Sequence, residues 1–242
     1  MKCTSYSIHT PVPQPMKIAV CSDLHDNPYE KAVELLLAEK PDLIALPGDI
    51  GETSCETEGN GIAFMRACVG IAPTVYALGN HDKAYNNDPA MAELIRNLGV
   101  TLLDDSDVFL QNIWIGGLTT GFRGQKHEGY FADTPKPNLK WLDEVFCQRP
   151  GFKLLLSHHP EYYHAYLRER DIHLVLSGHA HGGHWRFFGR GVLAPGQGLF
   201  PKYTEGVHEN RLVISRGMGD HTGIPRMFNP HEIVMLHLCP GD

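Results

Sequence analysis

Short apolar runs recur along this chain, and each is followed at once by Asp, His or Asn. These runs are typical of strands; they are residues 17–21, 43–46, 74–78, 153–156 and 172–176. The segments between them have helical patterning, and several open with Pro or Asn as a first-turn signal; they are residues 28–40, 60–69, 89–98, 138–147 and 160–170. Strands that alternate with helices predict an α/β fold.

The polar residues that follow the apolar runs fall at the carboxyl ends of the predicted strands. They are Asp23 and His25, Asp49, Asn80 with His81 and Asp82, His158 with His159, and His179 with His181. Ligands of α/β sheets bind outside this end of the strands. His179 and His181 are two residues apart, so in an extended segment both rings can reach one metal centre. The sequence therefore predicts one polar site built from five strand ends.

Carboxylates and imidazoles together suit the hydrolysis of a phosphate ester. That reaction needs neutralised phosphoryl oxygens, a strong nucleophile near pH 7 and a proton for the leaving group. Two metal ions roughly 3.5–4 Å apart meet the first two needs, and a mixed oxygen and imidazole ligand set accepts Mn²⁺, Fe²⁺, Co²⁺, Ni²⁺ or Zn²⁺. With Asp23 and Asp49 ionised, two such ions keep a positive surplus. That surplus can attract phosphate although the formal net charge of the chain is −7.

Five motifs resemble, in order and separation, the blocks of the calcineurin-like metallophosphoesterases. They are Asp23-x-His25, Gly48-Asp49, Gly79-Asn80-His81-Asp82, His158-x-Pro160 and Gly178-His179-x-His181. The stretch after His181, with the later motif Ser215-Arg216-Gly217-x-Gly219, is similar to a small bacterial phosphodiesterase branch. The resemblance implies a four-layer α/β sandwich in which two mixed β-sheets are flanked by helices. Candidates for the second sheet are residues 114–118, 185–188, 211–215 and 232–238.

The resemblance also implies a role for each motif residue. The first metal ion would be held by Asp23, His25 and His181, and the second by Asn80, His158 and His179. Asp49 would bridge the two ions, and a bridging hydroxide would attack phosphorus. His81 would stay off the metals and act as the general acid, with Asp82 orienting His81 or its loop.

Some of these assignments leave alternatives open. The family spacing between ligand and proline favours His158 over its neighbour His159, which would then lie next to the ligands without binding metal, or on the surface. For Asp82 the alternative is loop capping. His184 and Arg123 are expected to contact substrate, and the loops 84–88 and 121–137 are expected to wall the site. The histidines outside the motifs, among them His221, are expected to be structural or surface residues.

The expected function is cleavage of a phosphodiester or pyrophosphate bond by a metal-dependent phosphoesterase. Phosphomonoester hydrolysis on the same site is the alternative, and a non-catalytic protein-binding scaffold is a rival from a different class. All the motif residues are present here, which favours an enzyme. Mn²⁺ is the first choice of metal, with Fe²⁺, Zn²⁺, Ni²⁺ or Co²⁺ as alternatives. No Tyr occurs in residues 50–54, which argues against a ferric tyrosinate centre.

The composition favours one enzyme domain. We expect a proline-rich leader over residues 1–16, extended on the surface, and a single domain over residues 17–242. Residues 1–16 lack the apolar segment of a signal peptide, and six scattered cysteines without C-x-x-C spacing are typical of reduced thiols. These features predict a cytoplasmic protein.

Without a Lys/Arg cluster an extended nucleic-acid surface is not expected, so the predicted partner is a small phosphorylated substrate. No run approaches the roughly twenty apolar residues of a membrane span; peripheral membrane contact and the oligomeric state stay open.

Overall fold

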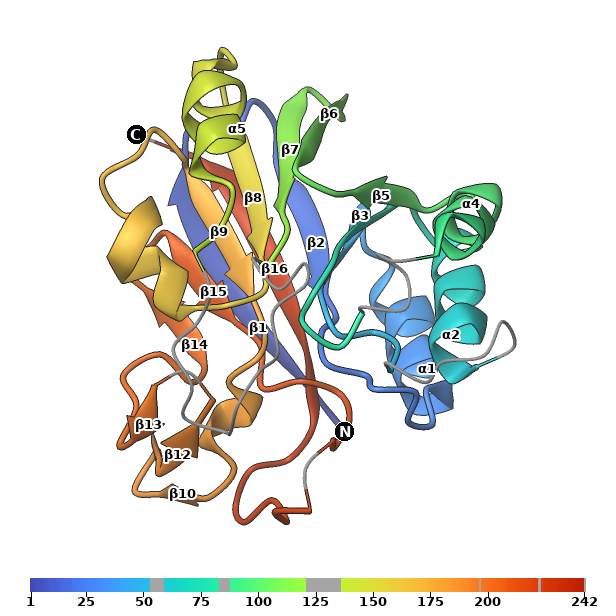
Figure 1. Ribbon diagram of the computed structural model, residues 1–242, viewed down its shortest axis with the longest axis vertical. Helices are drawn as coiled ribbons and strands as arrows, with labels where there is room; N and C mark the ends of the chain where they lie inside the picture. The colour runs from blue at the N-terminus through green and yellow to red at the C-terminus, as the bar shows by residue number, and fades with distance from the viewer. Residues whose placement is uncertain (53–58, 83–87, 121–135, 196, 222, 242) are drawn as a thin grey trace.

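Two six-stranded sheets pack face to face in this computed structural model, which describes residues 1–52, 59–82, 88–120, 136–195, 197–221 and 223–241 (Figure 1). The first sheet has the order β1 (Lys2–Thr10), β16 (Glu232–Pro240), β2 (Met16–Val20), β3 (Leu43–Pro47), β4 (Thr74–Ala77) and β5 (Thr101–Leu103). The second has the order β14 (Gly206–His208), β15 (Leu212–Ile214), β9 (Leu174–Ser177), β8 (Lys153–Ser157), β7 (Ile113–Leu118) and β6 (Ser106–Leu110). Both sheets are mixed, because β16 runs antiparallel to β2, and β6 and β14 run antiparallel to their neighbours.

Helices cover the outer face of each sheet. The first sheet carries α1 (Glu30–Glu39), α2 (Asn60–Val69) and α4 (Pro89–Asn97), seen on the right in Figure 1. The second carries α5 (Leu139–Glu144), a 3-10 turn (Phe146–Gln148) and a π-helical turn (Tyr163–Leu167). Three buried apolar clusters fill the spaces between the four layers. The predicted α/β fold, with two mixed β-sheets flanked by helices, is therefore confirmed.

The central strands form where the sequence is apolar on both faces. All five residues of β3 are buried, as expected for a parallel strand covered on both sides. The helices begin at polar caps: the Asp88 side chain accepts a hydrogen bond from the Ala90 N–H and Asn138 accepts one from the Trp141 N–H. Across the described ranges, no helix has the length and apolar character needed to cross a membrane.

Three segments lie elsewhere than the sequence suggests. Residues 2–10 of the expected leader form β1, which pairs in parallel with β16 along its whole length. The segment 232–238 belongs to the first sheet rather than the second, because β16 inserts between β1 and β2. The segment 185–188 contributes β10 (Arg186–Phe187), which forms a two-stranded sheet with β11 (Arg190–Gly191). A second small hairpin follows, formed by β12 (Leu193–Ala194) and β13 (Gly198–Leu199). Local patterning identifies the segments 185–188 and 232–238 as strands but misses β1, β11, β12 and β13, and it does not give their pairing partners.

Candidate metal centre

The loops after β2, β3, β4, β8 and β9 converge at one edge of the sandwich. Backbone hydrogen bonds join them: the Asp23 N–H donates to the Gly48 carbonyl and the His25 N–H to the Asp49 carbonyl, each at 3.1 Å. The His179 N–H donates to Asp23 Oδ1 at 2.9 Å. Strands of both sheets therefore contribute to one buried site, as the strand-end pattern predicts.

One group of metal-ligating atoms consists of Asp23, His25 and His181, all buried. His25 Nε2 lies 3.3 Å from His181 Nε2. Asp23 Oδ1 lies 3.6 Å from His181 Nε2 and 4.0 Å from His25 Nε2. These are the three residues that the family resemblance assigns to the first ion, and the fold brings their donor atoms together.

A second group consists of Asp49, His158 and His179. His158 Nε2 lies 2.9 Å from Asp49 Oδ2. On the other side of the ring, Nδ1 lies 2.8 Å from the Pro47 carbonyl, which can only accept, so Nδ1 keeps its proton and Nε2 is the nitrogen that would ligate a metal ion. Asn80 Oδ1 is a buried acceptor without a hydrogen-bond partner among the described residues. A buried oxygen of this kind is suited to ligate a bound cation.

The charge balance of the centre also fits bound cations. Asp23 and Asp49 are almost completely buried, and neither forms a salt bridge with a described Lys or Arg. Burial raises the pKa of Asp23; for Asp49 burial is outweighed by His158 and His81, which lower its pKa. Burial opposes protonation of His158, yet Asp49 and Asp23 raise its pKa to about 10. Buried carboxylates need compensating positive charge, and the donor set suits divalent ions.

Backbone conformation at the centre is unusual for non-glycine residues. Five of the motif residues have φ between 45° and 65°, namely Asp23, His25, Asp49, His179 and His181. Residues other than glycine seldom adopt this region, and it concentrates at functional sites. Gly178 has a different constraint, because a Cβ there would collide with the side chains of Ser22 and Asp23.

Asp82 supports the backbone around the centre. It is fully buried, and its Oδ2 accepts hydrogen bonds from the Asp49 and Gly79 N–H groups, both at 2.7 Å. Its Oδ1 accepts from the Gly51 N–H at 3.2 Å. Burial and the neighbouring Asp49 carboxylate raise the pKa of Asp82 to about 6. Asp82 thus fixes the two loops that carry Asp49 and His81, whereas the His81 ring itself contacts Glu52 and the rings of His25 and His221.

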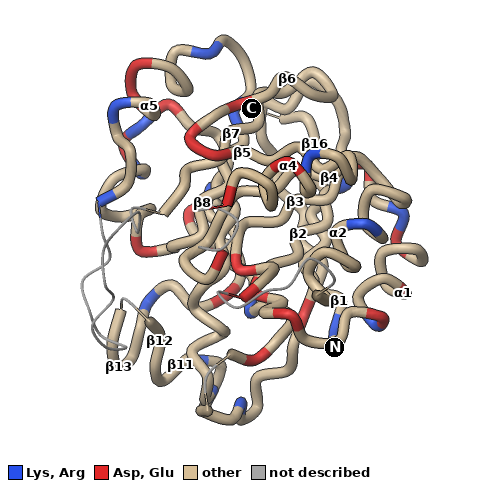
Figure 2. The backbone as a smooth tube through the Cα atoms, turned by 45° about the vertical axis from the view of Figure 1, so that its right-hand side comes forward, with Lys and Arg blue, Asp and Glu red and all other residues tan. Residues whose placement is uncertain are grey.

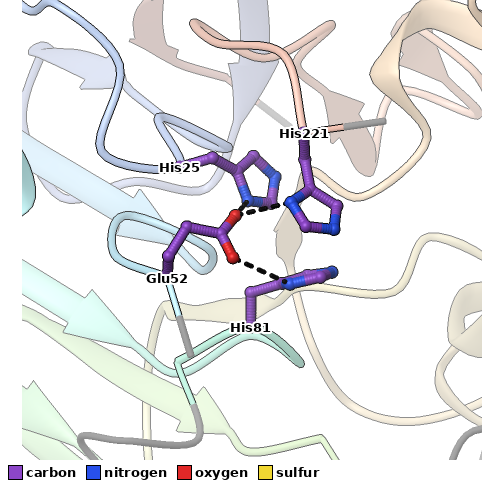
Figure 3. Close-up of side chains that lie close together, drawn as sticks. All are labelled: His25, Glu52, His81 and His221. Atoms are coloured by element: carbon purple, nitrogen blue, oxygen red, sulfur yellow. Dashed lines mark hydrogen bonds and ion pairs between the residues drawn. The ribbon is translucent and has the colours of Figure 1, made fainter. Parts of the chain in front are cut away.

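Glu52 gathers three imidazoles beside the two donor groups (Figure 3). Its Oε1 lies 2.6 Å from His25 Nδ1 and 2.7 Å from His221 Nδ1, and its Oε2 lies 3.4 Å from His81 Nδ1. Burial opposes protonation of His81, but Asp49 and Glu52 raise its pKa. The His81 and His221 ring centroids are 3.9 Å apart. These four residues also form a set of donors close enough to hold a cation.

Sequence reasoning misses Glu52 and His221. Glu52 stands three residues after Asp49, so its position in the chain is a usable signal. His221 lies in the connection between β15 and β16, far from every motif, and is expected to be structural or on the surface. The structure instead brings it to the edge of the centre, with 35% of its side chain exposed.

His159, His184 and Arg123 are the other residues that the sequence suggests for the site. His159 is fully buried and groups with Glu161 and His179, so it is a neighbour of the centre and not a surface residue. His184 is buried and stacks on His181 with 5.5 Å between ring centroids. Burial and Arg226 lower the pKa of His184 to about 4, so its ring is neutral at pH 7. Arg123 and most of the loops 84–88 and 121–137 lie outside the described residues.

Comparisons with known proteins consistently match this chain to phosphoesterases. A family model for calcineurin-like phosphoesterases matches residues 16–183. An uncharacterized metallophosphoesterase of Campylobacter jejuni is 28% identical over 229 residues, covering 92% of this chain and 59% of that protein. An uncharacterized metallophosphoesterase of Helicobacter pylori is 26% identical over 238 residues, covering 94% and 60%. The phosphodiesterase YaeI of Escherichia coli is 28% identical over 242 residues, covering 93% and 82%. The chain spans about three fifths of the length of the first two relatives.

Proposed function

This chain belongs to the calcineurin-like phosphoesterase family, and on that premise we propose that it hydrolyses a phosphodiester or pyrophosphate bond with two divalent metal ions. The main support for this proposal is structural. Two adjacent groups of donor atoms are present, one formed by Asp23, His25 and His181 and the other by Asp49, His158 and His179. The similarity to a protein named as a phosphodiesterase supports the choice of diester. Mn²⁺ is the metal we expect first.

Each donor group would hold one ion. Asp23, His25 and His181 would bind the first, and Asn80, His158 and His179 the second, with Asp49 facing both. When bound, the two ions supply charge neutralisation at the phosphoryl oxygens and a nucleophile near pH 7. The protein keeps the ligating rings in the required form: the Pro47 carbonyl holds the proton of His158 at Nδ1, and the Glu52 carboxylate holds that of His25 at Nδ1.

His81 would protonate the leaving oxygen. It is absent from the two groups that contain Asp23 and Asp49, and its Nδ1 faces Glu52. The other ring nitrogen points away from Glu52 in Figure 3, where it can meet a substrate oxygen. The Asp49 and Glu52 carboxylates favour the protonated ring that a general acid requires.

The test is hydrolysis of bis-p-nitrophenyl phosphate beside p-nitrophenyl phosphate, with protein loaded with Mn²⁺, Fe²⁺, Zn²⁺, Ni²⁺ or Co²⁺ in turn. We expect faster turnover of the diester. A strong preference for the monoester would replace the diester assignment with phosphomonoesterase activity. Failure to hydrolyse either compound with any of the metals would favour a binding scaffold.

A further inference from the structure

Exposed apolar side chains gather in one part of the molecule, residues 184–204 with residues 225–228, which we call the aromatic lobe. Of the ten large hydrophobic side chains that are exposed among the described residues, seven belong to it. They are Trp185, Phe187, Phe188, Leu199, Phe200, Met227 and Phe228. The hairpins that carry most of them lie at the lower left of Figure 1. A concentration of this kind marks an interaction surface.

Most of these residues are joined by a ring contact, a backbone bridge or a shared cavity. The Phe187 and Phe228 ring centroids are 5.9 Å apart, and Trp185 and Met227 are joined by a β-bridge. A cavity of about 540 Å³ is lined by Phe187, Phe188, Val192 and Phe200, together with Arg190 and Gly191. Phe188 is fully exposed and Phe200 is 78% exposed, so the rings project outward instead of closing over a core.

The charge of the lobe is opposite to that of the chain. Residues 184–204 include Arg186, Arg190 and Lys202 but no Asp or Glu, whereas the whole chain has a formal net charge of −7. Arg186 is paired with Glu205. Arg190 and Lys202 are exposed, and neither forms a salt bridge with a described residue. The segment with β11, β12 and β13 lies at the lower left of Figure 2.

The basic residues lie directly beside the apolar cavity. A second cavity of about 470 Å³ is lined by Arg186, Arg190 and Lys202, and also by Glu205, the partner of Arg186; it shares Arg190, Gly191 and Phe200 with the first. This part of the molecule therefore places outward aromatic rings next to two exposed cations, Arg190 and Lys202, that form no salt bridge with a described residue; Lys202 Nζ lies 4.9 Å from the centroid of the Tyr203 ring. That combination is typical of proteins that lie on a bilayer containing anionic lipid.

We propose that the aromatic lobe docks on the surface of a bilayer that contains anionic phospholipid. The rings of Phe188, Phe200 and Phe228 would enter the boundary between headgroups and acyl chains, while Arg190 and Lys202 would contact the phosphates. The lobe is joined to the candidate metal centre, because the Val192 N–H donates to the Gly183 carbonyl at 3.1 Å. Docking is independent of turnover, so it can fail or succeed separately from the proposed hydrolysis.

The experiment is flotation with vesicles of phosphatidylcholine alone and of an equal mixture of phosphatidylcholine and phosphatidylglycerol. The unmodified chain should float with the mixed vesicles and release as salt is raised. Arg190→Gln and Lys202→Gln should each weaken partition by about fivefold, and the double variant Phe188→Ser with Phe200→Ser should abolish flotation. Phe109→Ser is the matched control, because Phe109 is 55% exposed but lies on β6.

Three results would overturn the proposal. The first is failure of the unmodified chain to float with the mixed vesicles. The second is equal flotation of the Phe109→Ser and Phe188→Ser/Phe200→Ser proteins. The third is a dimer in sedimentation velocity that the aromatic variants abolish while flotation persists, which would assign the surface to a second copy of the chain. Unchanged circular dichroism and unchanged hydrolysis of a soluble diester establish that the variants are folded.

Discussion

At the scale of single residues, the centre depends on how each ring nitrogen is used. His158 and His25 each point Nδ1 at an oxygen acceptor, the Pro47 carbonyl and the Glu52 carboxylate, which leaves Nε2 toward the carboxylates of Asp23 and Asp49. His81 shares the Glu52 carboxylate but is not grouped with Asp23 or Asp49. In the proposed mechanism, His25 and His158 would therefore ligate metal and His81 would transfer the proton.

This division gives contrasting expectations for two substitutions. His81→Ala should retain both metal ions and lose turnover by about 10²- to 10⁴-fold, because only the proton donor is removed. Asp49→Ala should lose metal, because it removes the carboxylate that faces both ions. Metal content by mass spectrometry, measured beside kcat, separates the two effects. Equal metal loss in both proteins would contradict the assigned roles.

Glu52 should determine the alkaline limit of activity. Its carboxylate raises the pKa of His81, so that the protonated acid persists to higher pH. Glu52→Gln removes this charge, the pKa of His81 falls, and the alkaline limb of the kcat profile should move to lower pH. The profile is measured at saturating Mn²⁺, since losing the partner of His25 should also weaken metal binding by about 10- to 100-fold. Glu34→Gln, at an exposed glutamate of α1, is the control, and an identical shift in it would argue against a local effect.

At the scale of elements, the strands of the site are predictable because the signal is local. An apolar run followed by Asp or His marks the ends of β2, β3, β4, β8 and β9 without knowledge of their partners. β16 is different, because it pairs Glu232 with Lys2 at the opposite end of the chain. Nothing in residues 232–240 encodes that pairing. The position of His221 cannot be predicted locally either, because the loop before β16 brings it to Glu52. Glu52 is three residues after Asp49, so a prediction from the local sequence could have included it in the site.

Asp82 is the connection between elements on which the centre most depends. Asp82→Ala leaves three buried N–H groups, those of Asp49, Gly51 and Gly79, without their acceptor. Each unsatisfied donor costs about 1–3 kcal/mol, so urea unfolding of the metal-free protein should show a loss of at least about 3 kcal/mol. Asp82→Asn keeps one side-chain carbonyl and should lose less. Equal stability of Asp82→Ala and the unmodified protein would show that these hydrogen bonds are dispensable.

At the scale of the whole molecule, the centre joins the two sheets. Asp23 and Asp49 follow strands of the first sheet, whereas His158 and His179 follow strands of the second. The family resemblance predicts this sandwich, but the assignment of individual segments to each sheet comes only from the structure. Ions bound at such a junction connect both halves of the fold.

Metal should therefore stabilise the entire domain. One ion at 100 times its Kd adds about 2.7 kcal/mol to the free energy of unfolding, which for a domain of this size raises Tm by roughly 5–10 °C. Adding Mn²⁺ to chelated protein should produce such a shift in a thermal melt. His81→Ala should show the same shift and His181→Ala a smaller one. The same Tm with and without metal in the unmodified protein would show that no ion binds the folded chain in preference to the unfolded one, and would contradict the metal centre.

Our proposal requires two divalent ions, held by the two adjacent donor groups, for phosphoester hydrolysis. It is tested most directly by following bis-p-nitrophenyl phosphate hydrolysis in anaerobically purified protein before chelation, after chelation, and after Mn²⁺ is returned, with metal content measured at each stage. We predict two ions per chain in the active protein, loss of hydrolysis with loss of metal, and recovery on addition of Mn²⁺. Full hydrolysis by the metal-free protein would rule out a metal-dependent mechanism.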